Sequence, residues 1–212
     1  MSASAPLPIV VLLSGSGSNL QAIIDAAQGD LPVVIRAVIS NRADAYGLER
    51  ARSTGIPARV LSHQEFADRE AYDEALMALI DSYQPQLVVL AGFMRILSEN
   101  FVRHYAGRLF NIHPSLLPRH KGLHTHQRAI EAGDREHGAT VHFVVPELDA
   151  GPIVLQARVK IESGDSAESL AQRVLVQEHQ IYPQAIRWFA EGRLRLIDGI
   201  AHLDGDPIVI EH

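Results

Sequence analysis

The stretch "PIVVLLSGSGSNLQAIIDAA", residues 8–27, decides the fold class. It begins with a continuous run of β-branched residues and leucine, a pattern typical of a strand that is covered on both faces. A loop of glycine and serine follows, and the remaining residues have the apolar spacing of a helix. Because a strand, a short loop and a helix are the first parts of a βαβ unit, the stretch predicts a parallel sheet.

The alternation of strands and helices continues along the chain to about residue 133. Further apolar runs predict strands at residues 35–40, 58–62, 85–93 and 108–113. Helical spacing and helix-ending signals predict helices at residues 46–55, 68–83 and 125–133. Alternating elements of this kind imply right-handed βαβ units within one open sheet.

The pattern changes in the last third of the chain. Residues 139–161 contain two apolar runs with a turn between them and no helix, which predicts antiparallel strands at the edge of the sheet. A long helix is predicted at 166–191, where we expect Pro183 to kink or divide it, and 192–205 predict a terminal hairpin. We therefore expect an α/β fold: an open, mostly parallel twisted sheet with helices on both faces and an antiparallel C-terminal extension.

Length and composition limit the classes of protein to consider. The 212 residues suit a single domain over 1–212, with an N-terminal half at about 8–105 and a C-terminal half at about 106–212. The net charge of −6 argues against a nucleic-acid partner. The lack of cysteine excludes disulfides, thiolate nucleophiles and cysteine-bound zinc, and it fits the cytoplasm. The apolar run at 9–13 is too short to span a membrane, so we expect no membrane association.

The glycine loop "SGSGSN", residues 14–19, lies where a helix offers free N–H groups to an anion. A dinucleotide-binding loop would need glycine at the position of Leu20, and a nucleotide triphosphate loop would need a Gly-Lys pair that is absent. A single phosphate, bound by amides and by the hydroxyls of Ser16 and Ser18, fits better. A plain strand-to-helix turn capped by serine or asparagine is an equally good interpretation of the loop alone.

Asn111 and His113 stand at the predicted carboxyl end of a strand, where ligands gather in parallel sheets. Being two residues apart in an extended chain, their side chains point to the same face. A carboxamide donor beside an imidazole is a plausible oxyanion site with an acid or base. Asp149, in the turn "ELDAG", is the best candidate for a carboxylate that orients the histidine and favours its protonated form. Taken singly, each of these residues is more often structural than catalytic.

The remaining histidines allow a metal site as an alternative. His124 and His126 could form a ligand pair, but no H-E-x-x-H helix and no clear carboxylate ligand accompanies them. We therefore expect no metal, a solvated position for His120, supporting roles for His124 and His126, and a hydrogen-bonded strand position for His142.

Several motifs together carry a resemblance to a known family. In chain order they are "SGSGSNLQA", "VISNRADAYGLERA", "LAGFMRIL", "NIHPSLLP", "GATVHFV", "LDAGPI" and "QEHQIYP". Over about residues 8–200 the chain closely resembles the phosphoribosylglycinamide formyltransferases, folate-dependent enzymes of purine synthesis with a Rossmann-like fold. "NIHPSLLP" and the later Asp-x-Gly are shared with the wider superfamily, which includes methionyl-tRNA formyltransferase and formyltetrahydrofolate hydrolase. "SGSGSN" is typical of the phosphoribosylglycinamide branch.

The resemblance implies a role for each matching residue. The catalytic group would be Asn111, His113 and Asp149. Gly17, Ser18, Asn19 and Glu178 would bind the phosphoribosyl substrate, so that the N-terminal half carries the phosphate. The folate pocket would be lined by Arg69, Met94, Arg95, Ile96, Leu97 and Asn111.

The implied reaction is formyl transfer from 10-formyltetrahydrofolate, a co-substrate, to the amine of phosphoribosylglycinamide, without a metal. The expected partners are these two small molecules, in a monomer or a homodimer. Three other functions remain open: a metal hydrolase using the histidine loop, a non-catalytic phosphosugar-binding module, and a formyltetrahydrofolate hydrolase. Metal content would identify the metal hydrolase, and binding without turnover would identify the binding module. Formate release without the amine substrate would identify the formyltetrahydrofolate hydrolase.

Overall fold

The structure is a computed structural model that describes residues 5–210. It divides into two compact units between Phe110 and Asn111. The elements of the first unit are β1 (Leu7–Leu13), α1 (Ser18–Gln28), β2 (Val33–Ser40), α2 (Tyr46–Ser53), β3 (Ala58–Val60), the 3₁₀ turn η1 (His63–Glu65), α3 (Arg69–Ser82), β4 (Leu87–Leu90) and α4 (Glu99–His104). Strand β5 (Leu109–His113) crosses the division.

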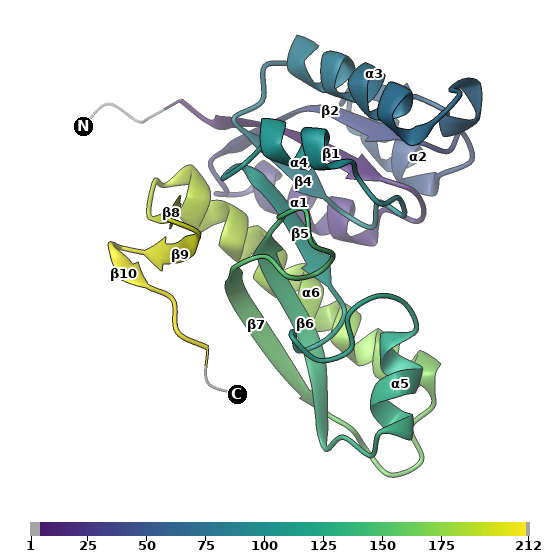
Figure 1. Cartoon of the computed structure of the whole chain (residues 1–212), viewed down its shortest axis with the longest axis vertical. Helices are drawn as coiled ribbons and strands as arrows, with labels where there is room; N and C mark the ends of the chain where they lie inside the picture. The colour runs from purple at the N-terminus through teal and green to yellow at the C-terminus, as the bar shows by residue number, and fades with distance from the viewer. Residues whose placement is uncertain (1–4, 211–212) are drawn as a thin grey trace. The chain divides into compact units, whose positions relative to one another are not determined.

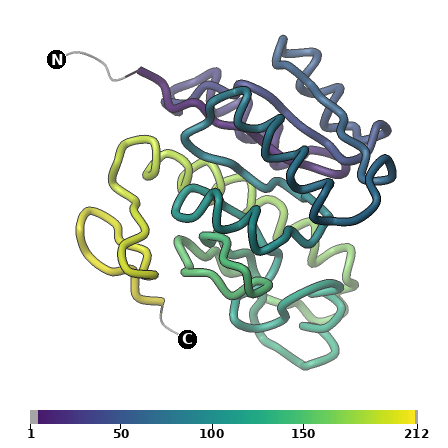
Figure 2. Tube along the Cα trace, turned by 45° about the horizontal axis from the view of Figure 1, so that its top comes forward, coloured from purple at the N-terminus to yellow at the C-terminus, as the bar shows by residue number. Residues whose placement is uncertain are grey.

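The second unit continues from β5. Its elements are α5 (Thr125–Glu131), β6 (Glu136–Phe143), β7 (Ile153–Lys160), α6 (Ala167–Ala190), β8 (Leu194–Ile197), β9 (Ile200–Leu203) and β10 (Asp206–Pro207). Figure 1 labels these helices and strands, and α6 packs along β6 and β7. Strands β8 to β10 form a small antiparallel sheet of their own, drawn in yellow in Figure 2.

The main sheet has seven strands in the order β3-β2-β1-β4-β5-β6-β7. β1 pairs in parallel with both β2 and β4, and β6 pairs with β7 in antiparallel fashion. The residues from Ile9 to Leu13 are fully buried, as the unbroken apolar run predicts for a central strand. The expected α/β class, with a mostly parallel sheet and an antiparallel C-terminal part, is confirmed.

Two features of the helices differ from the sequence-based expectation. The short helix α4 was not predicted, because it has only six residues, although Ser98 caps it by accepting from the Phe101 N–H. Pro183 does not divide α6, which is continuous from Ala167 to Ala190. Leu170 and Ile186, on either side of the proline, are fully buried, so packing on both sides outweighs the lost backbone hydrogen bond.

The length and apolar character of the helices decide whether one of them could cross a membrane. Among the helices formed by residues 5–210, none combines the length and the apolar character that crossing a membrane requires.

Candidate active site

The glycine loop of the first unit presents an open helix end. Helix α1 begins after Gly17, which takes a left-handed conformation with φ 71°, and no side chain caps this helix. The expectation of a serine or asparagine cap is therefore wrong. The first N–H groups of a helix have no partner within the helix, so they are available to an anion.

Helix α2 contacts the glycine loop and holds its backbone in place. The Gly47 N–H donates to the Gly15 carbonyl at 3.0 Å, and the Arg50 guanidinium donates to the Ser16 carbonyl at 2.8 Å. A Cβ atom on Gly17 would lie 2.5 Å from the Cα of Gly47, so the two backbones touch. Sequence reasoning assigned no role to Gly47 or Arg50. A glycine in the first turn of a helix is the signal that points to such a close approach.

A polar chain links this loop to the segment after β4. The Ser14 hydroxyl donates to Asn41 Oδ1 at 2.6 Å and accepts from the Met94 N–H at 2.8 Å. Together these groups border a pocket of 520 Å³ within the first unit. Its lining residues are Ser14, Gly15, Ser16, Gly17, Ser18, Asn19, Asn41, Arg42, His63, Ala91, Gly92 and Met94. The structure thus brings together four predicted binding residues and adds Ser14 and Asn41, which sequence reasoning missed.

The remaining predicted folate residues of the first unit follow Met94 or begin α3. Met94 and Ile96 are two-thirds and three-fifths exposed (66% and 62%), so this segment presents apolar surface that a ligand could cover. The Arg95 guanidinium stacks on the Tyr72 ring, and Leu97 is half-buried. Arg69 is exposed at the start of α3, where it pairs with Glu70.

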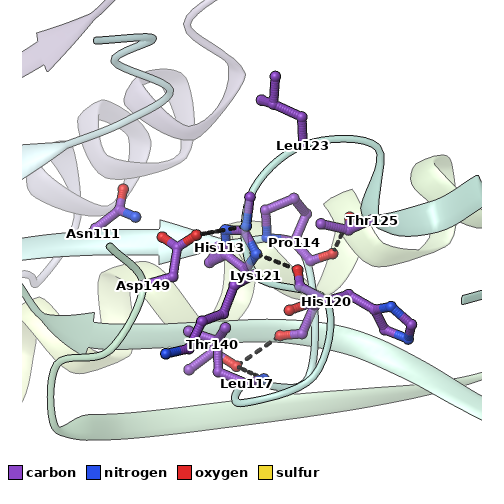
Figure 3. A network of polar contacts seen from close by, with 12 residues as sticks. Asn111, His113, Pro114, Leu117, His120, Lys121, Leu123, Thr125, Thr140 and Asp149 are labelled. Carbon is purple, nitrogen blue, oxygen red and sulfur yellow. Dashed lines mark hydrogen bonds and ion pairs between the residues drawn. The ribbon is translucent and has the colours of Figure 1, made fainter. Parts of the chain in front are cut away.

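Asn111 and His113 lie at the end of β5, and Asp149 lies in the turn between β6 and β7 (Figure 3). His113 is 6% exposed, and its Nδ1 lies 3.5 Å from Asp149 Oδ2. Its other ring nitrogen, Nε2, lies 2.9 Å from the carbonyl oxygen of His120. Both ring nitrogens therefore face oxygen atoms, which fixes the orientation of the ring.

A buried histidine sets the orientation of Asn111. His142 Nδ1 lies 2.8 Å from the carbonyl oxygen of Phe143, which can only accept, so Nδ1 carries the hydrogen. Nε2 is then the acceptor for the Asn111 amide N–H at 3.3 Å. Burial lowers the pKa of His142, so the ring stays neutral and keeps this lone pair. One N–H of Asn111 is thereby held, which fixes the orientation of its carboxamide.

Three further histidines, His120, His126 and His137, lie close to one another beside the catalytic group. His120, expected to be solvated, is instead 13% exposed and bonded to Asp134 at 2.7 Å, because the loop folds back on the start of β6. His126 Nδ1 lies 3.1 Å from His137 Nε2, and burial lowers the pKa of His137 to about 4. His124 is exposed at the start of α5. Within residues 5–210, no three histidine, aspartate or glutamate side chains are placed to hold a metal ion.

The last predicted residue, Glu178, lies on α6 and is 7% exposed. A carboxylate is rarely buried to this extent unless it is paired with another polar group.

Comparison with known proteins identifies the family. Residues 7–186 match the model of a family described as formyl transferase. The chain is 60% identical over 201 residues to phosphoribosylglycinamide formyltransferase of Escherichia coli (strain K12), an alignment that covers 94% of this chain and 95% of the relative. The chain belongs to the phosphoribosylglycinamide formyltransferase family.

Two further comparisons support membership in the phosphoribosylglycinamide formyltransferase family. The Haemophilus influenzae phosphoribosylglycinamide formyltransferase is 54% identical over 201 residues, with 94% of this chain and 95% of the relative covered. The solved structure of the Coxiella burnetii phosphoribosylglycinamide formyltransferase, in complex with CHES, superposes with a TM-score of 0.93 at 55% identity, covering 96% of each chain. The resemblance inferred from the sequence motifs is confirmed.

Proposed function

We propose that the protein is a transferase that moves a formyl group from 10-formyltetrahydrofolate to the amine of phosphoribosylglycinamide. The products are formylated phosphoribosylglycinamide and tetrahydrofolate, and the step belongs to purine (IMP) biosynthesis. Family membership supports this assignment. The observation that carries it is the group formed by Asn111 and His113 at the end of β5 with Asp149 from the turn between β6 and β7, which has the donors needed for acyl transfer.

The reaction is a direct transfer between two bound substrates. The amine attacks the formyl carbon, so a new C–N bond forms and the carbonyl oxygen becomes an oxyanion. An N–H of the Asn111 carboxamide donates to this oxyanion as its charge develops, and the neighbouring His113 ring serves as the acid. The bond from carbon to the folate nitrogen then breaks. The proton lost by the amine reaches that nitrogen, with His113 giving and regaining a proton on the way.

Asp149 has two tasks in this scheme. Its carboxylate faces His113 Nδ1 and so holds the ring in a fixed orientation. It also accepts from the Gly122 N–H at 2.8 Å, which ties the loop beyond β5 to the turn that carries the carboxylate. The chain has no cysteine, and no covalent formyl-enzyme is needed for the transfer.

Each substrate has its own proposed contacts. The phosphate lies at the open end of α1, on the amides and hydroxyls of Gly17, Ser18 and Asn19, and Glu178 contacts the same substrate. The folate contacts Asn111, Arg69 and the segment from Met94 to Leu97. We further propose that no metal takes part and that the enzyme acts in the cytoplasm, as a monomer or a homodimer.

An absorbance assay of folate deformylation tests the proposal. Loss of the formyl group should be recorded with and without phosphoribosylglycinamide, for the wild-type protein and for Asn111→Ala. We expect deformylation only when the amine substrate is present, and a decrease in kcat of roughly 10²- to 10³-fold in the variant. Equal rates of formate release with and without the amine would instead identify a formyltetrahydrofolate hydrolase.

A further inference from the structure

The turn from Asp149 to Pro152 lies against the end of β6. Asp149 takes a left-handed conformation with φ 50°, and two residues later Gly151 comes close to Phe143. A Cβ atom on Gly151 would overlap the carbonyl oxygen of Phe143 and lie 2.8 Å from its carbonyl carbon. The Phe143 N–H also donates to the Pro152 carbonyl at 3.0 Å. The turn can close in this way only because residue 151 has no side chain.

The carbonyl that Gly151 touches is the one that fixes His142. The same Phe143 oxygen accepts from His142 Nδ1, and His142 Nε2 in turn accepts from the Asn111 amide. The position that a Cβ on Gly151 would occupy is also 3.4 Å from His142 Nδ1. One turn therefore supports both sides of the catalytic group: directly through Asp149 on His113, and indirectly through Phe143 and His142 on Asn111.

We propose that Gly151 is a positioning residue for formyl transfer. By letting the turn close on the Phe143 carbonyl, it keeps that oxygen at His142 Nδ1, and so it sets the tautomer of His142 and the orientation of the Asn111 carboxamide. This inference rests on the proposed function, because it assigns Gly151 to the oxyanion site of that reaction. The Asp-x-Gly motif gives this glycine only as a sequence position. The structure adds its contact with the Phe143 carbonyl, from which we infer its effect on the orientation of Asn111.

Gly138 provides a matched control for a purely structural effect. A Cβ atom there would overlap the carbonyl oxygen of Ala157, a collision of the same kind between β6 and the chain beside it. The Ala157 carbonyl, however, takes no part in the contacts of Asn111, His113, His142 or Asp149 described above. Gly138→Ala should therefore reduce stability without changing the tautomer of His142.

The experiment compares wild type, Gly151→Ala and Gly138→Ala. Denaturant unfolding measures stability, steady-state kinetics gives kcat and both KM values, and ¹⁵N NMR of the imidazole rings reads the tautomer of His142. We expect both variants to lose stability. Only Gly151→Ala should lose kcat, by roughly 10- to 100-fold, because displacing the turn misplaces Asp149 as well as the Phe143 carbonyl. Its two KM values should stay within about threefold of wild type, which corresponds to unchanged ground-state binding.

Three results would overturn the inference. The first is an equal loss of kcat in the two variants, and the second is an unchanged His142 tautomer in Gly151→Ala. The third needs only wild-type protein and so remains decisive if Gly151→Ala does not fold: His142 carrying its hydrogen on Nε2. Failure of the proposed function would look different, because wild type itself would then show no deformylation that depends on phosphoribosylglycinamide, whatever the tautomer of His142.

Discussion

Replacing His142 with phenylalanine should slow catalysis by releasing Asn111. The ring is 2% exposed, so phenylalanine fills a similar buried volume while removing the acceptor for the Asn111 amide. The lost hydrogen bond joins two neutral groups, and such a bond is worth about 0.5–1.5 kcal/mol net. At about 1.4 kcal/mol per factor of ten, kcat should fall by roughly 2- to 13-fold. This is far less than the roughly 10²- to 10³-fold expected for Asn111→Ala, which removes the oxyanion donor itself.

The double variant provides the sharper test of this reasoning. If His142 acts only through Asn111, then adding His142→Phe to Asn111→Ala should change kcat by no more than about twofold, since the group it orients is already gone. The measurement is the folate deformylation rate with both substrates saturating. The reasoning is refuted if the two effects multiply, or if His142→Phe raises KM and leaves kcat unchanged.

A control variant separates orientation from simple burial. His137 is also buried, at 1% exposed, and it is bonded to His126. His137→Phe should lower stability by a comparable amount, because each replacement removes one hydrogen bond from a buried ring to a half-buried partner, at about 0.5–1.5 kcal/mol. It should leave kcat close to wild type.

Three further predictions concern binding, pH and metal ions. Gly17→Ala should raise KM for phosphoribosylglycinamide by at least about tenfold, seen in steady-state kinetics with KM for folate unchanged, because a Cβ would lie 2.5 Å from Gly47 in a strained left-handed conformation. The pKa of His137 is lowered to about 4, so the unfolded chain binds the extra proton between pH 6.5 and 4 and stability falls as pH drops through this window. Urea unfolding should show a loss of about 2 kcal/mol from pH 7 to pH 5 that is absent in His137→Phe. Activity should survive exhaustive chelation; loss of activity restored by zinc alone would contradict the proposed chemistry.

The sequence was informative where local pattern and tertiary role coincide. The buried strand before the glycine loop, helix α3 with its Asp68 cap, and the end of β5 at His113 all follow from periodicity and capping residues. Helix α4 was missed because six residues give too little periodicity. The continuity of α6 at Pro183 depends on packing against β6 and β7, which no local pattern contains.

The candidate site shows the same contrast between features that follow from the local sequence and features that depend on tertiary packing. Asn111, His113 and Asp149 could be named from their residue types and positions, but the bond between Asn111 and His142 could not. The pairing of β6 with β7 shifts register between Val141 and His142, and such an irregularity redirects a side chain. An alternating apolar pattern carries no sign of this shift, so His142 looked like an ordinary strand residue.

The contact between Gly17 and Gly47 also changes how the two motifs that contain them should be compared between proteins. The glycines are thirty positions apart in the chain (47 − 17 = 30), yet their backbones touch: a Cβ on Gly17 would lie 2.5 Å from the Gly47 Cα, and a Cβ on Gly47 would overlap the Leu13 side chain and lie 3.2 Å from the Gly17 Cα. The two positions should therefore be conserved together or replaced together. In any chain that keeps this loop geometry, both positions should stay glycine together, and a related sequence that has lost one of them should have reshaped the anion loop and changed its ligand.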